Sequence, residues 1–486
     1  MSTIPRNLAG VSFLHLPDEI REEIIADLER HQDLVSLALV SRAHSKTVIP
    51  HHTEYRTIRI RHPMPYMWAH LARRSDLARH IREVHLCARW DYTAPDRFPT
   101  SLIDKNIDEN EENLDETTRF RNVCEALRHM RHLTVFTWEY IWNSAWAQRP
   151  NPTLENQVLR TISGITSLRH LALHGNFGRH TMLGKCLDDT DYPLWGISGL
   201  TSLSFLTHAC IIPSNGAQVF HMLQQSPGLE FLEMPMEFKR LADCHFPVLK
   251  TLKLRLLSGT ISSIDQSRIT FIENHPSIEE LTWFPIGPVD FSIDSIPSIR
   301  RLKAGRQVLD ALEKQNIVRH IEYLDILSLS SEDILSLHLL HRESLRMLKL
   351  HALGTLEGIY NLAQTFPNIT WLSMPAVHLG PEGPQKINID EWYEILSHFQ
   401  NLEVFRGDGI WSAVDYNNNA MHVAIMNLVN LCPKLRQLDH SAFDEKRHEW
   451  KRITIRREGP EGENVRYEVR KPPPWRFFVA MEEIYS

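Results

Sequence analysis

One short pattern recurs along most of this chain: an apolar residue, two variable residues, an apolar residue, one variable residue and usually another apolar residue. It returns at intervals of 20 to 35 residues. A segment of that length cannot bury its own apolar side, so neighbouring units must stack and share a core. The pattern therefore predicts a solenoid. The first apolar positions of its twelve units are Leu133, Leu168, Leu200, Leu229, Leu249, Ile278, Ile299, Ile321, Leu345, Ile369, Leu402 and Leu435.

Proline marks the turn that precedes many of these units. In six of the twelve, proline lies two positions before the first apolar residue, whereas fewer than one case would be expected from 27 randomly placed prolines. Most units also follow a helix-like segment, as in residues 219–232 (VFHMLQQSPGLEFL). This order of helix, turn and short strand resembles irregular, fungal-type leucine-rich repeats. The resemblance implies an α/β fold with parallel strands inside and helices outside.

Residues 13–50 have a different, helical pattern. Pro17 suits a first helical position, and Ile20, Ile24 and Leu28 recur at four-residue spacing on one face. Asp33 is a plausible N-cap for a second helix, which is expected to continue to Pro50. Two helices of this length lack a sufficient core, so their apolar faces should pack on the rest of the chain or on a partner protein.

This N-terminal stretch resembles an F-box. The resemblance rests on residues 16–20 (LPDEI), Ile24, Leu28, residues 33–34 (DL) and residues 39–42 (LVSR); it departs from the family at His44, where a Trp is usual. It implies docking on a Skp-family adaptor and, through it, on a cullin. The docking residues carried over by position are Leu16, Pro17, Ile20, Ile24, Leu28, Leu34, Leu37, Val40, Ser41 and Arg42.

Together the two resemblances imply a substrate-recognition adaptor of an SCF-type cullin–RING ubiquitin ligase, with an unidentified protein target held by the repeats. The alternative is a leucine-rich-repeat interaction scaffold unconnected to a ligase, in which the N-terminal helices only cap the solenoid. The sequence contains no GxxxxGK[ST], GxSxG, HExxH or CxxC motif. We therefore expect no enzymatic activity, cofactor or metal, although a site in the inter-repeat loops stays a third alternative.

The charge and cysteine content limit which partners and which cellular compartment we expect. Acidic residues outnumber basic ones by 60 to 53, which disfavours a nucleic-acid partner because a broad basic face is missing. Six widely spaced cysteines are typical of reduced thiols in an intracellular protein. No signal peptide or membrane span is evident, so a cytoplasmic or nuclear location without membrane contact is expected.

The residues on either side of each central apolar position should point away from the repeat core, because strand side chains alternate. Exposed aromatic rings beside basic residues are typical of protein interfaces. Tyr323, Lys349 and Trp371 are therefore the candidate target-binding residues, and we expect them to be exposed.

The predicted organisation has four parts. Residues 12–51 form the F-box helices, and residues 52–130 form a transition with the first irregular repeats and an acidic loop at 102–117. Residues 131–442 form the solenoid. Residues 443–486 form a C-terminal cap, with a hairpin around residues 453–455 and 465–469 followed by a short helix.

Overall fold

The computed structural model describes residues 13–28, 31–49, 51–60, 64–86, 97–99, 115–139, 152–175, 177, 192–207, 210, 215–257, 266–293, 295–315, 317–326, 343–352, 355–380, 383–444, 449–458 and 464–471. The chain divides into two compact units. The first comprises residues 1–88, 96–172 and 189–199, and the second comprises residues 89–95, 173–188 and 200–486.

The strands form an α/β solenoid of the leucine-rich-repeat-like type, as the repeat pattern predicts. Among the described residues, the main sheet has sixteen strands in chain order, and the pairs between its successive repeat strands are parallel wherever their register is defined. These strands are β1 (Thr57–Ile60), β2 (Glu83–Leu86), β3 (Val135–Glu139), β4 (His170–Gly175), β5 (Ser202–Thr207), β6 (Phe231–Pro235), β7 (Thr251–Arg255), β8 (Glu280–Trp283), β9 (Arg301–Ala304), β10 (Tyr323–Ile326), β11 (Met347–Leu350), β12 (Trp371–Ser373), β15 (Val404–Arg406) and β16 (Gln437–Asp444), followed by β17 (Glu449–Glu458) and β18 (Asn464–Arg470).

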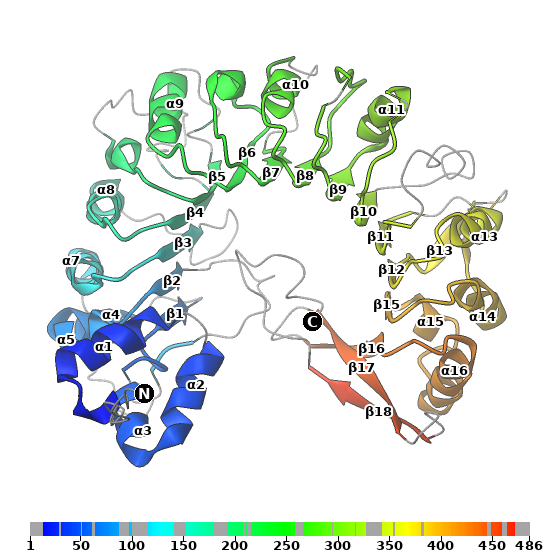
Figure 1. Cartoon of the computed structure of the whole chain (residues 1–486), viewed down its shortest axis with the longest axis horizontal. Coiled ribbons are helices and arrows are strands. Elements are labelled where there is room, and N and C mark those ends of the chain that lie inside the picture. The colour runs from blue at the N-terminus through cyan, green and yellow to red at the C-terminus, as the bar shows by residue number, and fades with distance from the viewer. Residues whose placement is uncertain are drawn as a thin grey trace, which may run out of the picture. The chain divides into compact units, whose positions relative to one another are not determined.

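Helices connect the strands and cover one side of the sheet within each unit; α9, α10 and α11 of the second unit show this clearly (Figure 1). The repeat helices are α4 (Pro65–Arg73), α5 (Ser75–Ala78), α7 (Glu116–His129), α8 (Pro152–Ser163), α9 (Gly216–Gln224), α10 (Gln266–Glu273), α11 (Arg306–Lys314), α13 (Leu356–Thr365), α14 (Ile389–Ser397), α15 (Gly409–Ser412) and α16 (Asn418–Leu431), with 3-10 turns η3 (Pro193–Gly196) and η6 (Lys239–Asp243). In the described residues, no helix is long and apolar enough to cross a membrane.

The core lies between the strands and these helices, and the repeated apolar residues build it. In one unit, Leu229, Leu232 and Met234 are each completely buried. All twelve predicted units coincide with strands β3 to β12, β15 and β16. Several helices start at side-chain caps that the sequence supplies, such as Asn388, whose side chain and Glu391 form a reciprocal capping box at α14.

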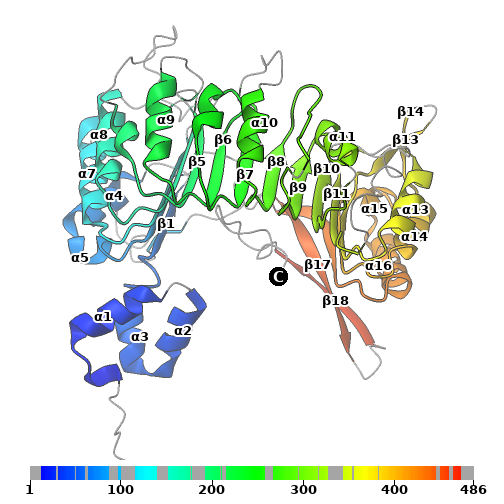
Figure 2. The same cartoon turned by 45° about the horizontal axis from the view of Figure 1, so that its top comes forward.

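The N-terminal segment contains one helix more than predicted. It comprises η1 (Phe13–His15), α1 (Asp18–Asp27), α2 (His31–Val40) and α3 (Arg42–Val48), which lie together in Figure 2. The expectation of a single second helix reaching Pro50 was wrong because Ser41 adopts an extended conformation and caps a new helix. α2 also begins before Asp33, which lies in its first turn and is not its cap.

The C-terminal hairpin prediction is confirmed: β17 pairs antiparallel with β18, and with β16 on its other side. A second hairpin, β13 (Val377–Gly380) with β14 (Gly383–Lys386), was not predicted. Most of the predicted acidic loop and all of the predicted C-terminal helix lie outside the described residues.

The four described cysteines, Cys124, Cys210, Cys244 and Cys432, are buried free thiols.

Candidate functional site

The three N-terminal helices hold each other through a small core of their own. Ile25 of α1, Leu34 and Ala38 of α2 and Val48 of α3 form a buried cluster, against which partly buried residues pack. Leu34 and Ala38 are four residues apart, so they lie on the same face of α2. This face of α2 is therefore used inside the chain and is not free for a partner.

A second set of apolar side chains on the same helices faces solvent. On α2, Val35, Leu39 and Val40 are 39%, 81% and 68% exposed, and on α1 Ile20 and Ile24 are 43% and 41% exposed. Ile20 and Ile24 share one face of α1, and Val35 and Leu39 share one face of α2, because each pair is four residues apart. We call these five residues the N-terminal apolar set. Exposed apolar residues that share a helix face are typical of protein-interaction sites.

The ten predicted docking residues fall into three groups of exposure. Pro17, Ile20, Ile24, Val40 and Arg42 are exposed; Leu16, Leu28, Leu37 and Ser41 are partly buried; and Leu34 is buried. Leu34 is therefore a core residue, which corrects its assignment to a docking surface. Val35 and Leu39 were missed as candidates, although their four-residue spacing in the sequence signals a shared face.

Ser41 and His44 stabilise the junction between α2 and α3. The Ser41 hydroxyl accepts a hydrogen bond from the His44 backbone N–H at 3.3 Å, and its Oγ lies 2.7 Å from His44 Nδ1. The buried His44 ring stacks on Phe13, with ring centroids 5.3 Å apart. His44, where the F-box family usually has Trp, thus packs inside the helical unit that α1, α2 and α3 form.

On the sheet, two of the three candidate target-binding residues are not exposed as expected. Tyr323 and Trp371 are each 5% exposed, and they form a buried cluster with Val404 and partly buried Met347. These four residues are register partners on β10, β11, β12 and β15. Strands are about 4.8 Å apart, so large side chains in one row cover each other. Alternation alone could not predict this mutual burial.

Lys349, the third candidate, belongs to a charge cluster around buried Asp325. The Asp325 carboxylate lies 3.0 Å from Lys303 Nζ, 3.9 Å from Lys349 Nζ and 2.7 Å from His351 Nε2. Burial tends to raise the pKa of Asp325, but the charges of Lys303 and Lys349 hold it below its usual value. The Lys349 side chain is 34% exposed and can reach a ligand.

A buried hydrogen-bonded row of His, Ser and Glu crosses β4, β5 and β6, but its hydrogen-bond directions do not activate the serine as a nucleophile. The Ser204 hydroxyl donates to Glu233 at 2.6 Å, and Ser204 Oγ lies 2.7 Å from His174 Nε2. Because the single hydroxyl proton is directed to Glu233, the imidazole must donate to Ser204 and cannot act as its base. Arg255 also contacts Glu233 at 2.8 Å. These hydrogen-bonded side chains are suited to holding the neighbouring strands together.

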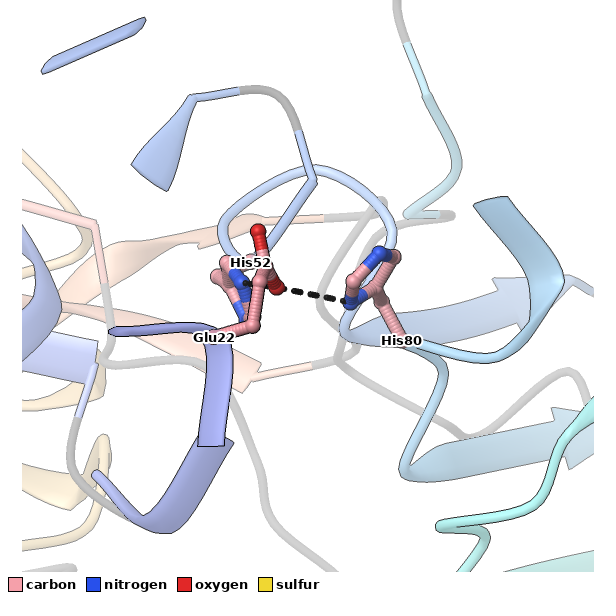
Figure 3. A group of neighbouring side chains, drawn as sticks. All are labelled: Glu22, His52 and His80. Carbon is pink, nitrogen blue, oxygen red and sulfur yellow. Dashed lines mark hydrogen bonds and ion pairs between the residues drawn. The ribbon is translucent and has the colours of Figure 1, made fainter. Parts of the chain in front are cut away.

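Glu22, His52 and His80 bring three potential metal-ligand atoms within 4.8 Å of one another, the only such group among the described residues. Their side chains point toward one another in Figure 3. Glu22 Oε2 lies 2.8 Å from His52 Nε2 and 3.9 Å from His80 Nδ1. Burial and then the Arg56 charge lower the pKa of His52 to about 4, and burial and then His52 lower that of His80 to about 4. Both imidazoles are therefore neutral at pH 7.

No family model matches the chain, and no curated protein matches it. One solved structure to which it is similar is the crystal structure of a TLR13–ssRNA13 complex, with 13% identity and a TM-score of 0.30. The match covers 68% of this chain and 48% of that chain, so this chain spans about half the length of the TLR13 chain.

Proposed function

We propose that this chain is the substrate-recognition adaptor of an SCF-type cullin–RING ubiquitin ligase. Its N-terminal helices would dock on a Skp-family adaptor, and its leucine-rich-repeat-like solenoid would hold a protein target. The observation that carries the proposal is the N-terminal apolar set: in a helical unit that already has its own core, further apolar side chains face solvent. These residues coincide with the stretch whose sequence resembles an F-box.

The role of the chain in this proposal is positioning and not chemistry. Holding a target lysine beside a ubiquitin-loaded conjugating enzyme converts a bimolecular encounter into a local one. The effective concentration of the lysine at the enzyme is therefore raised. The solenoid suits this role because a stack of repeats offers an extended surface for a folded partner. Partly exposed Lys349 is our candidate contact to the target, whereas buried Tyr323 and Trp371 would support the surface beneath it.

The test is co-purification of the adaptor with a paired variant. Leu16→Ala combined with Pro17→Ala removes the residues that open the F-box-like stretch, both outside the buried cluster of the helical unit. We expect the wild-type chain to recover a Skp-family subunit from its source cell and the double variant to lose it while the repeats stay folded. Full recovery with the double variant would contradict the proposal.

One observation favours the alternative of a scaffold whose helices cap the solenoid. Glu22 of α1 contacts His52 and His80, which lie beyond the helical unit, so α1 is tied to the start of the repeats. In this case deleting residues 1–50 would destabilise the whole array, and no Skp-family subunit would co-purify even with the full chain. The adaptor proposal instead expects the full chain to recover the subunit and the deletion to abolish that recovery.

A further inference from the structure

We propose that Glu22, His52 and His80 bind one divalent transition-metal ion, of which zinc fits best, and that this ion fastens α1 to the beginning of the solenoid. The inference concerns the first compact unit alone and does not depend on the proposed function. It rests on the convergence of three ligand-type side chains from three separate segments: α1, the turn after α3 and the turn after α5 (Figure 3).

The distances are close to those a metal ion requires. Zinc binds imidazole nitrogen and carboxylate oxygen at roughly 2.0–2.2 Å, so neighbouring ligand atoms in a tetrahedral site are about 3.4 Å apart. The Glu22–His52 and Glu22–His80 separations of 2.8 and 3.9 Å lie on either side of this value. Small side-chain rotations therefore suffice to bring all three atoms into coordination.

Burial limits competition from water while leaving an entry route. The side chains of His52 and His80 are 3% and 7% exposed, whereas that of Glu22 is 31% exposed. The ring of His51 lies beside the cluster, with its centroid 5.5 Å from that of His80. Among the described residues, its buried Nδ1 has no hydrogen-bond partner. His51 is therefore our candidate for a fourth coordination position, with water as the other choice.

The ligand types indicate which class of ion fits. Arg56, Arg79 and Arg82 exert positive potential on His52, which opposes any cation, so the choice between ions rests on the ligand atoms. Magnesium and calcium prefer several oxygen ligands, and this site offers one carboxylate. Imidazole-rich sets suit zinc, copper, iron and nickel instead. Zinc is the simplest choice because it is redox-inert and accepts three protein ligands plus one more.

The experiment uses the full chain purified without a histidine tag, stripped with a chelator and titrated with Zn²⁺ in a calorimeter. Co²⁺ then replaces Zn²⁺ as a visible-absorption probe of tetrahedral geometry. The test variants are Glu22→Gln and His80→Asn. The matched control is Glu125→Gln, because Glu125 lies 3.6 Å from His129 on α7 without belonging to a three-ligand group.

We expect one tightly bound ion per wild-type chain, an affinity at least tenfold weaker in each test variant, and unchanged binding in the control. Thermal unfolding supplies a second readout: Zn²⁺ should raise the Tm of wild type and control but not of Glu22→Gln, which retains a side chain of nearly the same shape. Absence of stoichiometric binding to the wild type would overturn the inference. Equal affinity in wild type and folded test variants would overturn it too.

Discussion

Leu39 offers a sharp test of whether the N-terminal apolar set is a docking surface. It is 81% exposed, the most of the five, so it contributes little to the packing of the helices themselves. Replacing it with Ala leaves no cavity and keeps a strong helix former, and the free energy of unfolding should change by less than about 0.5 kcal/mol. Any loss of partner binding would then result from the missing Leu39 contact and not from unfolding of the helices.

The expected loss of affinity follows from the area that Leu39 can still bury. Leu→Ala removes three carbon atoms, each contributing about 0.8 kcal/mol when fully buried. Because 81% of the residue is open to solvent in the free chain, docking over it can gain roughly 2 kcal/mol from these atoms. The dissociation constant for the Skp-family adaptor should therefore rise by about 30-fold.

The assay is titration calorimetry of the purified full chain with a purified Skp-family subunit. Val423→Ala is the matched control, because Val423 is an apolar residue on α16 that is 55% exposed and lies outside the N-terminal helices. We expect the control to bind as the wild type does. An unchanged dissociation constant for Leu39→Ala, in a complex that does form, would refute the reasoning.

Three further outcomes test the packing and electrostatics. Leu34→Ala, in the buried core of the same helices, should lower the free energy of unfolding of the first unit by about 3 kcal/mol in denaturant titration, in contrast to Leu39→Ala. Gly407→Ala should cost roughly 2 kcal/mol in the same assay, because Gly407 has φ of +125° and an added Cβ would lie 2.6 Å from the Met374 carbonyl oxygen. Asp325→Asn should destabilise the second unit by about 3 kcal/mol at pH 7. Since the folded-state pKa of Asp325 lies below its usual value of 3.8, this difference should persist above pH 3.8 and shrink as the pH falls through the lower folded-state pKa; a pH-independent difference would contradict it.

Periodicity predicted the solenoid well because every repeat has the same local spacing of apolar residues. Leu229 precedes β6, and Leu232 and Met234 alternate toward the core on it; the same spacing identifies all twelve units. The third N-terminal helix was missed since a single capping residue, Ser41, decides where α2 stops. No proline or glycine near Ser41 signals this break in the sequence.

The candidate surfaces were less predictable because they depend on which face of an element is already occupied. α2 is apolar on more than one side, so the sequence could not decide that Leu34 turns inward and Leu39 outward. On the sheet, Tyr323 and Trp371 occupy outward positions but bury each other across β10 to β12. Such cross-strand cover depends on the register of distant segments.

The His–Glu cluster was beyond sequence reasoning for a related reason. Glu22, His52 and His80 are separated by 30 and 28 residues and form no recognised ligand spacing. Histidines that are close in sequence, such as His129 and His132, do not belong to a three-ligand group among the described residues. Only the packing of α1 against the turns after α3 and α5 brings the three side chains together.

The most direct test of the central proposal, that the N-terminal helices present a surface for another polypeptide, is light scattering coupled to size exclusion. The purified full chain is mixed with an equimolar amount of a purified Skp-family subunit. We predict a single peak whose mass equals one copy of each protein. Two separate peaks at micromolar concentration, each with the mass of the free protein, would contradict the adaptor account and favour the scaffold.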